Sequence, residues 1–345
     1  MLFSERCTIN DVAQKAGVSA MAVSLALKKS PRVSPATRER ILAAAKELNY
    51  VPNQTARQLR SGKSDIIGFI AADLANPFHS MMVKQAEIAA RQSGLSVFVC
   101  SSNWSPVREL ESAERLIRMQ SRGVLVCPVS NDNTVFEMFQ TAGIPSVALD
   151  AVADTFQGCS VLNDLQRSGA LMAEHFAEIG VSIPIYIDAA NDKNNFCAFA
   201  KIRDGFCKRW LALRGTECRI ISGGMNIPAG SSACRELVKK QVKFDGVFCV
   251  NDLCALGFMD ESAKQGFTAG KDYALGGIDD IETASLSQIS LTSIRLPYQE
   301  IAANAVEILG SILEQRSGNV TGKVLPPVLL RRNTTLQFAK IKGLL

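Results

Sequence analysis

Hydrophobic residues near the N-terminus repeat with the period of a helix. Four of them fall at i, i+3, i+4 and i+7, on one helical face: Ile9, Val12, Ala13 and Ala16. Intervals of three and four residues recur shortly afterwards, among Ala22, Val23, Ala26 and Leu27. The pattern predicts two short helices, over 8–16 and 19–28, separated only by Gly17 and Val18.

Small polar residues stand where each of these helices would begin. The hydroxyls of Thr8 and Ser19 can accept hydrogen bonds from the free N–H groups of a first helical turn. Asp11 adds a negative charge in that turn, where the helix dipole favours it. Gly17 can adopt the left-handed backbone that a tight corner requires. Two capped helices joined by such a corner are typical of a helix-turn-helix.

A third helix is predicted over about 36–49, after a Ser34-Pro35 start. Its inward face should carry Ile41, Leu42, Ala45 and Leu48. It should end before Pro52, because the residue preceding a proline disfavours the helical conformation. The next segment, 53–59, has a helical composition but only about two turns, which is marginal for an isolated helix. We expect it to become ordered when a partner holds it.

From residue 65 onward, short apolar runs alternate with longer helical patterns. Strands are expected at 66–71, 95–100, 124–126, 146–149, 183–187, 219–222, 246–250 and 273–276. Helices are expected at 77–94, 108–122, 134–142, 167–179, 198–214, 231–241, 253–265 and 297–315. This alternation favours parallel, doubly wound sheets. Because one sheet would hold too many strands, we expect two subdomains.

Composition excludes several classes of protein. The 345 residues are 47% hydrophobic, yet no apolar run approaches the ~20 residues of a membrane span. The N-terminus lacks a signal-peptide pattern, so we expect a cytoplasmic protein without membrane association. The ten cysteines contain no C-x-x-C pair and the chain has only two histidines, which argues against a zinc site. We expect no metal, no cofactor and no enzymatic activity, since P-loop, G-x-S-x-G and G-x-G-x-x-G patterns are absent.

Positive charge is concentrated in the first 63 residues. They contain eleven Lys or Arg against four Asp or Glu, a formal charge of +7, whereas the whole chain carries +5. The remainder is therefore mildly acidic. A basic segment around a helix-turn-helix indicates DNA binding, because its charges attract the phosphate backbone.

Several motifs, taken in order, resemble the LacI/GalR (lactose-repressor/galactose-repressor) family of transcription regulators. They are Ala16-Gly17-Val18-Ser19, RVSPATRERI at 32–41 and the hinge pattern L-N-Y-x-P-N-x-x-A-R-x-L at 48–59. Later landmarks are Asn76-Pro77-Phe78, Ile144-Pro145, 203–206, Asn251-Asp252, 277–280 and Leu325-Pro326-Pro327. The resemblance covers nearly the whole chain.

The family resemblance implies a specific domain organisation. An all-α helix-turn-helix head would occupy 1–50, and a hinge helix with its linker 51–63. Residues 64–345 would form an α/β effector-binding and dimerisation domain of two doubly wound, parallel-sheet subdomains, similar to periplasmic binding proteins. The expected N-subdomain spans about 64–161 and 294–325, and the C-subdomain about 162–293 and 326–345, with crossings near Leu162, Ser293 and Pro326.

The same resemblance places the second helix in the major groove and 53–59 in the minor groove. The recognition positions are Ala20, Met21 and Leu25, which offer apolar contacts in place of the bidentate arginine–guanine contact common in DNA readout. Packing inside the head is an equal alternative for Leu25. Phosphate contacts are expected from Thr8, Ser19, Ser24, Lys28 and Arg32. The hinge would contribute Asn53, Ala56, Leu59 and Arg60, with Leu59 wedged between base steps beside its partner-subunit equivalent.

Candidate effector-binding residues follow strand ends in the body. Asp150, Asn251 and Asp279 each come directly after an apolar strand, and ligands bind at the carboxyl ends of parallel strands. The resemblance adds Arg203 and Phe78, and implies that carboxylate and guanidinium groups bind hydroxyls. For any single residue, a helix cap or surface ion pair is the alternative. The aromatic residue usual in sugar sensors is missing at 227–230; Phe196, Phe199, Phe248 or Trp104 could replace it.

These observations predict a sequence-specific DNA-binding transcriptional regulator. It would be a repressor that binds a pseudo-palindromic double-stranded operator as a homodimer and is switched by a carbohydrate-type small molecule bound between the subdomains. A periplasmic-type solute-binding protein without a DNA function is the disfavoured alternative. Residues 341–345 are expected to follow the last strand at once, leaving no space for a leucine-heptad tail, so a dimer is favoured over a tetramer.

Overall fold

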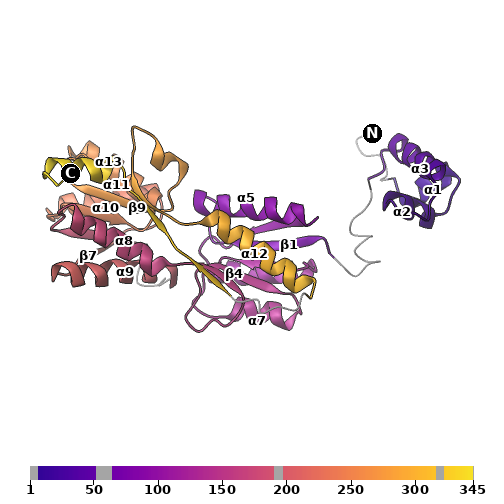
Figure 1. The fold of residues 1–345 in the computed structure, drawn as a ribbon, viewed down its shortest axis with the longest axis horizontal. Coiled ribbons are helices and arrows are strands. Elements are labelled where there is room, and N and C mark those ends of the chain that lie inside the picture. Colours follow the sequence, from indigo (N-terminus) through magenta and orange to yellow (C-terminus); the bar gives the residue numbers. More distant parts are fainter. Residues whose placement is uncertain (1–6, 52–63, 190–196, 316–321, 345) are drawn as a thin grey trace. The chain divides into compact units, whose positions relative to one another are not determined.

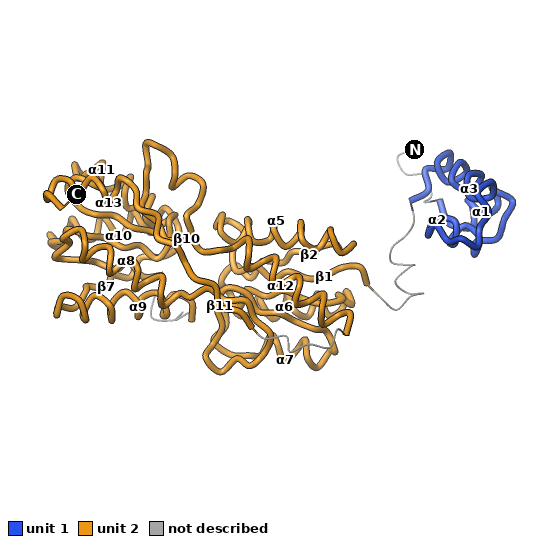
Figure 2. Tube along the Cα trace, viewed as in Figure 1, with its two compact units in different colours: residues 1–63 blue, residues 64–345 orange. Residues whose placement is uncertain are grey.

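The computed structural model describes residues 7–51, 64–189, 197–315 and 322–344. The chain divides into two compact units, residues 1–63 and 64–345, coloured separately in Figure 2. Each unit has its own hydrophobic core and is described by itself.

The described residues of the first unit, 7–51, form three short helices, α1 (Ile9–Ala16), α2 (Ala20–Leu27) and α3 (Pro35–Glu47). Thr8 and Asp11 form a reciprocal capping box at the start of α1, and Gly17 ends that helix with a left-handed backbone, φ 62°. Ser19 caps α2 and Ser34 caps α3. The three helices bury a common core of Val12, Ala13, Ala16, Val23, Ala26, Val33, Ile41, Ala44 and Ala45. The predicted helix-turn-helix is therefore present.

One expected core position in α3 is wrong. Leu42 is 47% exposed, whereas Ala44 is buried in its place. Because successive helical residues rotate by about 100°, Leu42 points away from the face that carries Ile41 and Ala45.

In the second unit, the residues that the structure describes form two six-stranded sheets. The first has the order β11-β5-β4-β3-β1-β2, and all its pairs are parallel. Its strands are β1 (Ile66–Ala71), β2 (Ser96–Ser101), β3 (Val124–Val126), β4 (Ser146–Asp150), β5 (Ser160–Asn163) and β11 (Lys323–Leu325). Helices α5 (Pro77–Gln92) and α12 (Tyr298–Leu313) lie side by side on it, and α6 (Pro106–Arg118) and α7 (Thr134–Thr141) complete its cover (Figure 1).

The second sheet has the order β12-β10-β9-β8-β6-β7, parallel except for the antiparallel β10–β12 pair. Its strands are β6 (Pro184–Asp188), β7 (Arg219–Ser222), β8 (Gly246–Cys249), β9 (Ala274–Ile278), β10 (Thr292–Arg295) and β12 (Val328–Leu330). The helices around it are α8 (Leu165–Glu178), α9 (Cys197–Arg214), α10 (Ile227–Lys239), α11 (Asp252–Lys264) and α13 (Asn333–Ile341), with a 3-10 turn at Glu282–Ser285.

The chain passes between the two sheets after β5, after β10 and between β11 and β12. We call the part around the first sheet the N-subdomain (64–163 and 297–325) and the other part the C-subdomain (164–296 and 326–344). Ser293 still pairs with Gly277 inside the second sheet. The second crossing therefore follows Arg295, two residues after Ser293, near which it was expected.

Two expected element boundaries are also wrong. Helix α10 starts at Ile227, not at 231, because Asn226 caps it and Pro228 fits its first turn. The end of the chain does not follow a strand at once, since α13 lies between β12 and the C-terminus. The β-branched Thr334 and Thr335 conceal that helix in the sequence; both are buried in it.

Glycine allows the close approach of α8 and α9. A Cβ atom on Gly205 would lie 2.0 Å from the carbonyl oxygen of Gln166, and one on Gly169 would lie 2.0 Å from that of Ile202. The helix backbones are thus in direct contact, which fixes the position of α9 and of the side chains that it presents.

Candidate functional site

Helix α2 carries the expected DNA-reading residues, Ala20 and Met21 in its first turn and Leu25 one turn later. The Ser19 hydroxyl accepts a hydrogen bond from the Ala22 N–H (3.2 Å), so the start of the helix is fixed. Met21 is 70% exposed. Ala20 and Leu25 are half-buried and pack against the core of the three helices. Met21 is therefore the recognition position with the most surface available to DNA, and Leu25 has a clear packing role.

The expected phosphate-contacting residues differ in availability. Lys28 and Arg32 are exposed, and Ser24 is half-buried. Thr8 is exposed, but its hydroxyl already bonds the Asp11 carboxylate at 2.7 Å within the capping box. The four expected hinge residues, Asn53, Ala56, Leu59 and Arg60, lie outside the described residues.

A cavity lies between the two subdomains, and several polar side chains interrupt its mostly apolar lining. It is lined by Asn76, Phe78, His79, Trp104, Asp150, Leu165, Ala198, Phe199, Ile202, Val250, Asn251, Ile278, Asp279 and Leu296. Asp150 ends β4, Asn251 follows β8 and Asp279 follows β9, so strand ends from both sheets contribute to it. Four of the five expected effector residues line this cleft: Phe78, Asp150, Asn251 and Asp279.

Arg203 is the fifth expected residue, and it does not line the cavity. Its guanidinium donates to the buried Asp188 carboxylate at 2.8 Å, at the end of β6. Its side chain is 26% exposed. Sequence reasoning did not identify Asp188 as its partner.

Asp279 connects the two halves of the cleft. The Asn76 side-chain amide donates to its carboxylate at 3.1 Å, and the Asn76 oxygen accepts from the Phe78 N–H at 3.0 Å, which caps α5. The Asp279 backbone has φ 107°, a conformation that non-glycine residues rarely adopt. Burial raises the pKa of its carboxyl well above the usual value.

Asp150 faces the same cavity from the N-subdomain. Its backbone is also left-handed, φ 72°, and Asn163 donates to its carboxylate at 2.5 Å. Burial raises the pKa of the Asp150 carboxyl to about 6, although that hydrogen bond opposes the shift. A strained backbone of this kind persists only where the surrounding structure holds it in place. The positions of both carboxyl groups are therefore fixed by the residues around them.

Buried groups behind the cavity hold these residues in place. Asn251 caps α11 by accepting from the Cys254 N–H at 2.9 Å, and its amide donates to the Met225 carbonyl at 2.9 Å. The neighbouring Asp252 accepts from the Ser293 hydroxyl at 2.6 Å and from the Ile281 N–H at 2.9 Å. Desolvation raises the pKa of Asp252 to about 7. Asn251 therefore supports the cleft wall, and Asp252 anchors the segment after Asp279.

Two of the four aromatic alternatives line the cavity. The rings of Trp104 and Phe199 are 5.0 Å apart, one from each subdomain, and His79 lies 5.7 Å from Trp104. Phe248 instead packs against Tyr186 and Phe206 in the core, and Phe196 lies outside the described residues. Sequence reasoning did not identify Asn76 and His79 as cavity residues. For Asn76, the helix-capping position directly before Pro77 was the signal that could have found it.

The cavity is too small for a sugar in this geometry. Its volume is about 30 Å³. One water molecule needs roughly 10–15 Å³ on this measure, so the space suits about two waters. A larger ligand requires the subdomains to separate or the lining side chains to move.

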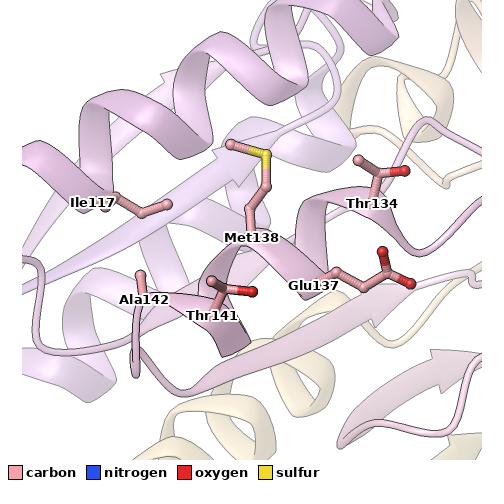
Figure 3. Close-up of a pocket in the computed structure, with 6 residues that line it drawn as sticks. All are labelled: Ile117, Thr134, Glu137, Met138, Thr141 and Ala142. Atoms are coloured by element: carbon pink, nitrogen blue, oxygen red, sulfur yellow. The ribbon is translucent and has the colours of Figure 1, made fainter.

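A second hollow lies on the N-subdomain surface, with a volume of about 430 Å³ (Figure 3). It is lined by Ile117, Thr134, Glu137, Met138, Thr141 and Ala142. It is larger than the cleft, but its polar groups do not converge on a point, whereas those of the cleft do. The cleft is therefore the stronger candidate for a ligand site.

Among the described residues, no group of three or more His, Cys, Asp or Glu side chains is placed to hold a metal ion. No helix within the described ranges is long and apolar enough to cross a membrane.

The fold and the site define a class of protein: a helix-turn-helix head followed by a two-subdomain body, with a cleft into which polar side chains of both subdomains converge. The model for bacterial regulatory proteins of the lacI family matches residues 8–53, and that for the periplasmic binding protein-like domain matches residues 171–335. The chain belongs to the LacI family. It is a DNA-binding transcriptional regulator with a small-molecule effector domain, and not an enzyme.

Similar proteins extend over nearly the whole chain. The HTH-type transcriptional repressor PurR of Vibrio atlanticus is 27% identical, over 95% of this chain and 98% of that protein. The ribose operon repressor of Escherichia coli is 28% identical, over 95% of this chain and 99% of that protein. The structure of the lac repressor dimer bound to operator and the anti-inducer ONPF has a TM-score of 0.85 and 25% identity, and covers 96% of this chain and all of that chain.

Proposed function

We propose that this protein is a cytoplasmic repressor. It binds a pseudo-palindromic operator as a homodimer, and a carbohydrate-type effector in the cleft sets its operator affinity. Similar proteins named as repressors, and a solved dimer on its operator, support this proposal. The observation that carries it is the convergence of Asp150 and Asp279 from opposite subdomains on one cavity.

The proposed division of labour follows the chain. Residues 1–50 bind the major groove, 51–63 form the hinge and 64–345 bind effector and the second subunit. The proposed DNA-contacting residues are Thr8, Ser19, Ala20, Met21, Ser24, Leu25, Lys28, Arg32, Asn53, Ala56, Leu59 and Arg60. Met21 makes the main exposed apolar base contact, and the exposed charges of Lys28 and Arg32 suit phosphate.

The charges of the cleft favour an uncharged effector. Two carboxylates line the cavity, and among its described lining residues there is no Lys or Arg. The Arg203 guanidinium is paired with Asp188, so it reaches a ligand only if that ion pair rearranges. A neutral ring with several hydroxyls can donate hydrogen bonds to Asp150 and Asp279. A phosphorylated or carboxylated sugar would bring its negative charge next to the Asp150 carboxylate, whose pKa of about 6 leaves it ionised at neutral pH.

Closure of the cleft provides the switch. Because the cavity admits about two waters, effector binding shifts the separation of the two subdomains. A ligand that binds the closed arrangement of the subdomains more tightly than the open one, or the reverse, shifts the populations of the two arrangements. Operator affinity then changes by the coupling free energy between the effector site and the DNA site.

The test has two stages. Selection from a random DNA pool should enrich a symmetric site, and a gel-shift titration then measures affinity for that site. Ribose and ribose 5-phosphate form a matched pair that differs only in the anionic group, and cellobiose tests a larger neutral sugar. We expect only neutral sugars to change operator affinity. No enrichment over random DNA would remove the operator proposal, and a response to the phosphorylated sugar alone would remove the neutral-effector proposal.

A further inference from the structure

Two cysteine thiols of the C-subdomain lie in direct contact, away from the cleft. The sulfur atoms of Cys207 and Cys218 are 2.8 Å apart, and the residues are 11 positions apart in the chain. Cys207 lies in α9, and Cys218 immediately precedes β7. Both side chains are partly exposed and carry free thiols. The proposed regulation by an effector uses neither of them.

We propose that Cys207 and Cys218 are a redox-reactive dithiol, which hydrogen peroxide converts into an intramolecular disulfide and a small thiol reduces again. One thiolate attacks the peroxide, breaks its O–O bond and becomes a sulfenic acid, while the other oxygen leaves as water after taking up a proton. The second thiol then attacks the sulfenic sulfur, forms the S–S bond and releases a second water. The peroxide is reduced by two electrons, and the two thiols are oxidised by two.

The contact geometry suits this reaction. A disulfide has an S–S distance of about 2.05 Å, so the sulfurs need to approach by only ~0.8 Å, which side-chain rotation can supply. A sulfenic acid formed on either residue would have its resolving thiol within reach at once. This arrangement favours the disulfide over further oxidation.

The contact between the two sulfurs also activates one of the thiols. Either sulfur can be the donor, and a hydrogen bond from one thiol stabilises the thiolate form of the other. Because thiolates are the nucleophiles, the deprotonated sulfur reacts with the peroxide first, and its neighbour resolves the sulfenic acid.

Another pair, Cys249 and Cys254, is the natural comparison. Both are fully buried, and burial raises the pKa of Cys249 well above its usual value. A buried thiol of high pKa reacts slowly with peroxide. Exposure together with sulfur contact therefore selects Cys207 and Cys218.

The disulfide would constrain a functional element. Cys207 lies one turn after Arg203 on α9, whose first turns supply Ala198, Phe199 and Ile202 to the cleft. A bond from this helix to the start of β7 ties its position to the edge of the second sheet.

Peptide mapping of the full-length protein tests the proposal. The reduced protein is treated with a small excess of hydrogen peroxide, alkylated and digested with trypsin. The disulfide should appear as peptide 204–208 (DGFCK) linked to peptide 215–219 (GTECR), each of which contains one cysteine. Dithiothreitol before alkylation should abolish the linked species, and Cys218→Ser should prevent it.

The same digest contains its own control. Peptide 244–264 carries both Cys249 and Cys254, and it should remain doubly alkylated. Linkage of Cys207 to Cys218 only when Cys249 and Cys254 also oxidise would indicate reaction of unfolded protein and would overturn the proposal. Recovery of both alkylated thiols, oxidation of Cys218 to sulfinic acid without linkage, or a link between two subunits on a non-reducing gel would overturn it as well.

Discussion

The side-chain amide of Asn76 donates a 3.1 Å hydrogen bond to the carboxylate of Asp279, and the two residues belong to different subdomains. They are 203 positions apart in the sequence. The same Asn76 side chain caps α5, so a single amide both starts a helix of the N-subdomain and holds the C-subdomain against it.

This contact predicts that Asn76→Ser opens the cleft without destroying the helix cap. Serine caps a helix about as well as asparagine, but it is too short to reach Asp279. Loss of one hydrogen bond of about 1 kcal/mol should reduce the ratio of closed to open molecules roughly fivefold. Small-angle X-ray scattering should record a larger radius of gyration for the variant at equal thermal stability.

Asn226→Ser is the matched control for this experiment. Asn226 caps α10 through the Ala229 N–H at 2.9 Å and is exposed. Its replacement should leave the scattering profile unchanged. Equal expansion of both variants would show that weakened capping, and not the contact across the cleft, governs closure.

The raised pKa of Asp150 predicts a pH dependence of stability. Its pKa is about 6 in the folded protein, whereas the usual value for an aspartic acid is 3.8, so the folded state binds more protons between these values. The free energy of unfolding should therefore fall as pH rises from about 4 to 6. The slope that this group contributes corresponds to a difference of at most one bound proton between the folded and unfolded states.

Asp150→Asn isolates that contribution. The amide oxygen can still accept from Asn163, but the residue no longer titrates. Urea unfolding at several pH values between 4 and 7 should show a flatter dependence for the variant than for the parent protein. An unchanged slope would mean that Asp150 ionises normally in the folded state.

The contact between α8 and α9 predicts a strong effect of one methyl group. Gly205→Ala places a Cβ atom 2.0 Å from the Gln166 carbonyl oxygen, so the helices must separate. We expect a loss of stability on the order of 2 kcal/mol, as is common for overpacked sites. Gly310→Ala is the control, because no atom lies within 4 Å of its Cβ position in α12. That variant should be neutral or more stable by up to ~1 kcal/mol in thermal unfolding.

How much of this molecule could be predicted from sequence depends on the range of the interactions. The caps Thr8, Ser19 and Ser34 act within one helical turn, so residue spacing was enough to find them. The strand ends of Asp150, Asn251 and Asp279 were visible because buried strands are short apolar runs.

Contacts between distant residues could not be predicted in the same way. Nothing near Arg203 in the sequence shows that its guanidinium meets Asp188. The Asn76–Asp279 contact likewise depends on the packing of two subdomains. Residues that lie on one side of such a contact were found as candidates, whereas their partners were missed.

The separate environments of Met21 and Leu25 predict separate effects of mutation. Met21 is 70% exposed, so Met21→Ala should leave the melting temperature of the head unchanged. If its side chain contacts a thymine methyl, operator binding should weaken by about 1 kcal/mol, roughly fivefold, with little change in binding to random DNA.

Leu25 packs against the core of the three helices. Leu25→Ala should therefore destabilise the head by roughly 1–2 kcal/mol, and binding to both DNAs should fall together. Fluorescence anisotropy with specific and random duplexes, alongside circular dichroism melts, measures both effects. Selective loss of operator binding in Leu25→Ala at unchanged stability would instead place Leu25 on the bases.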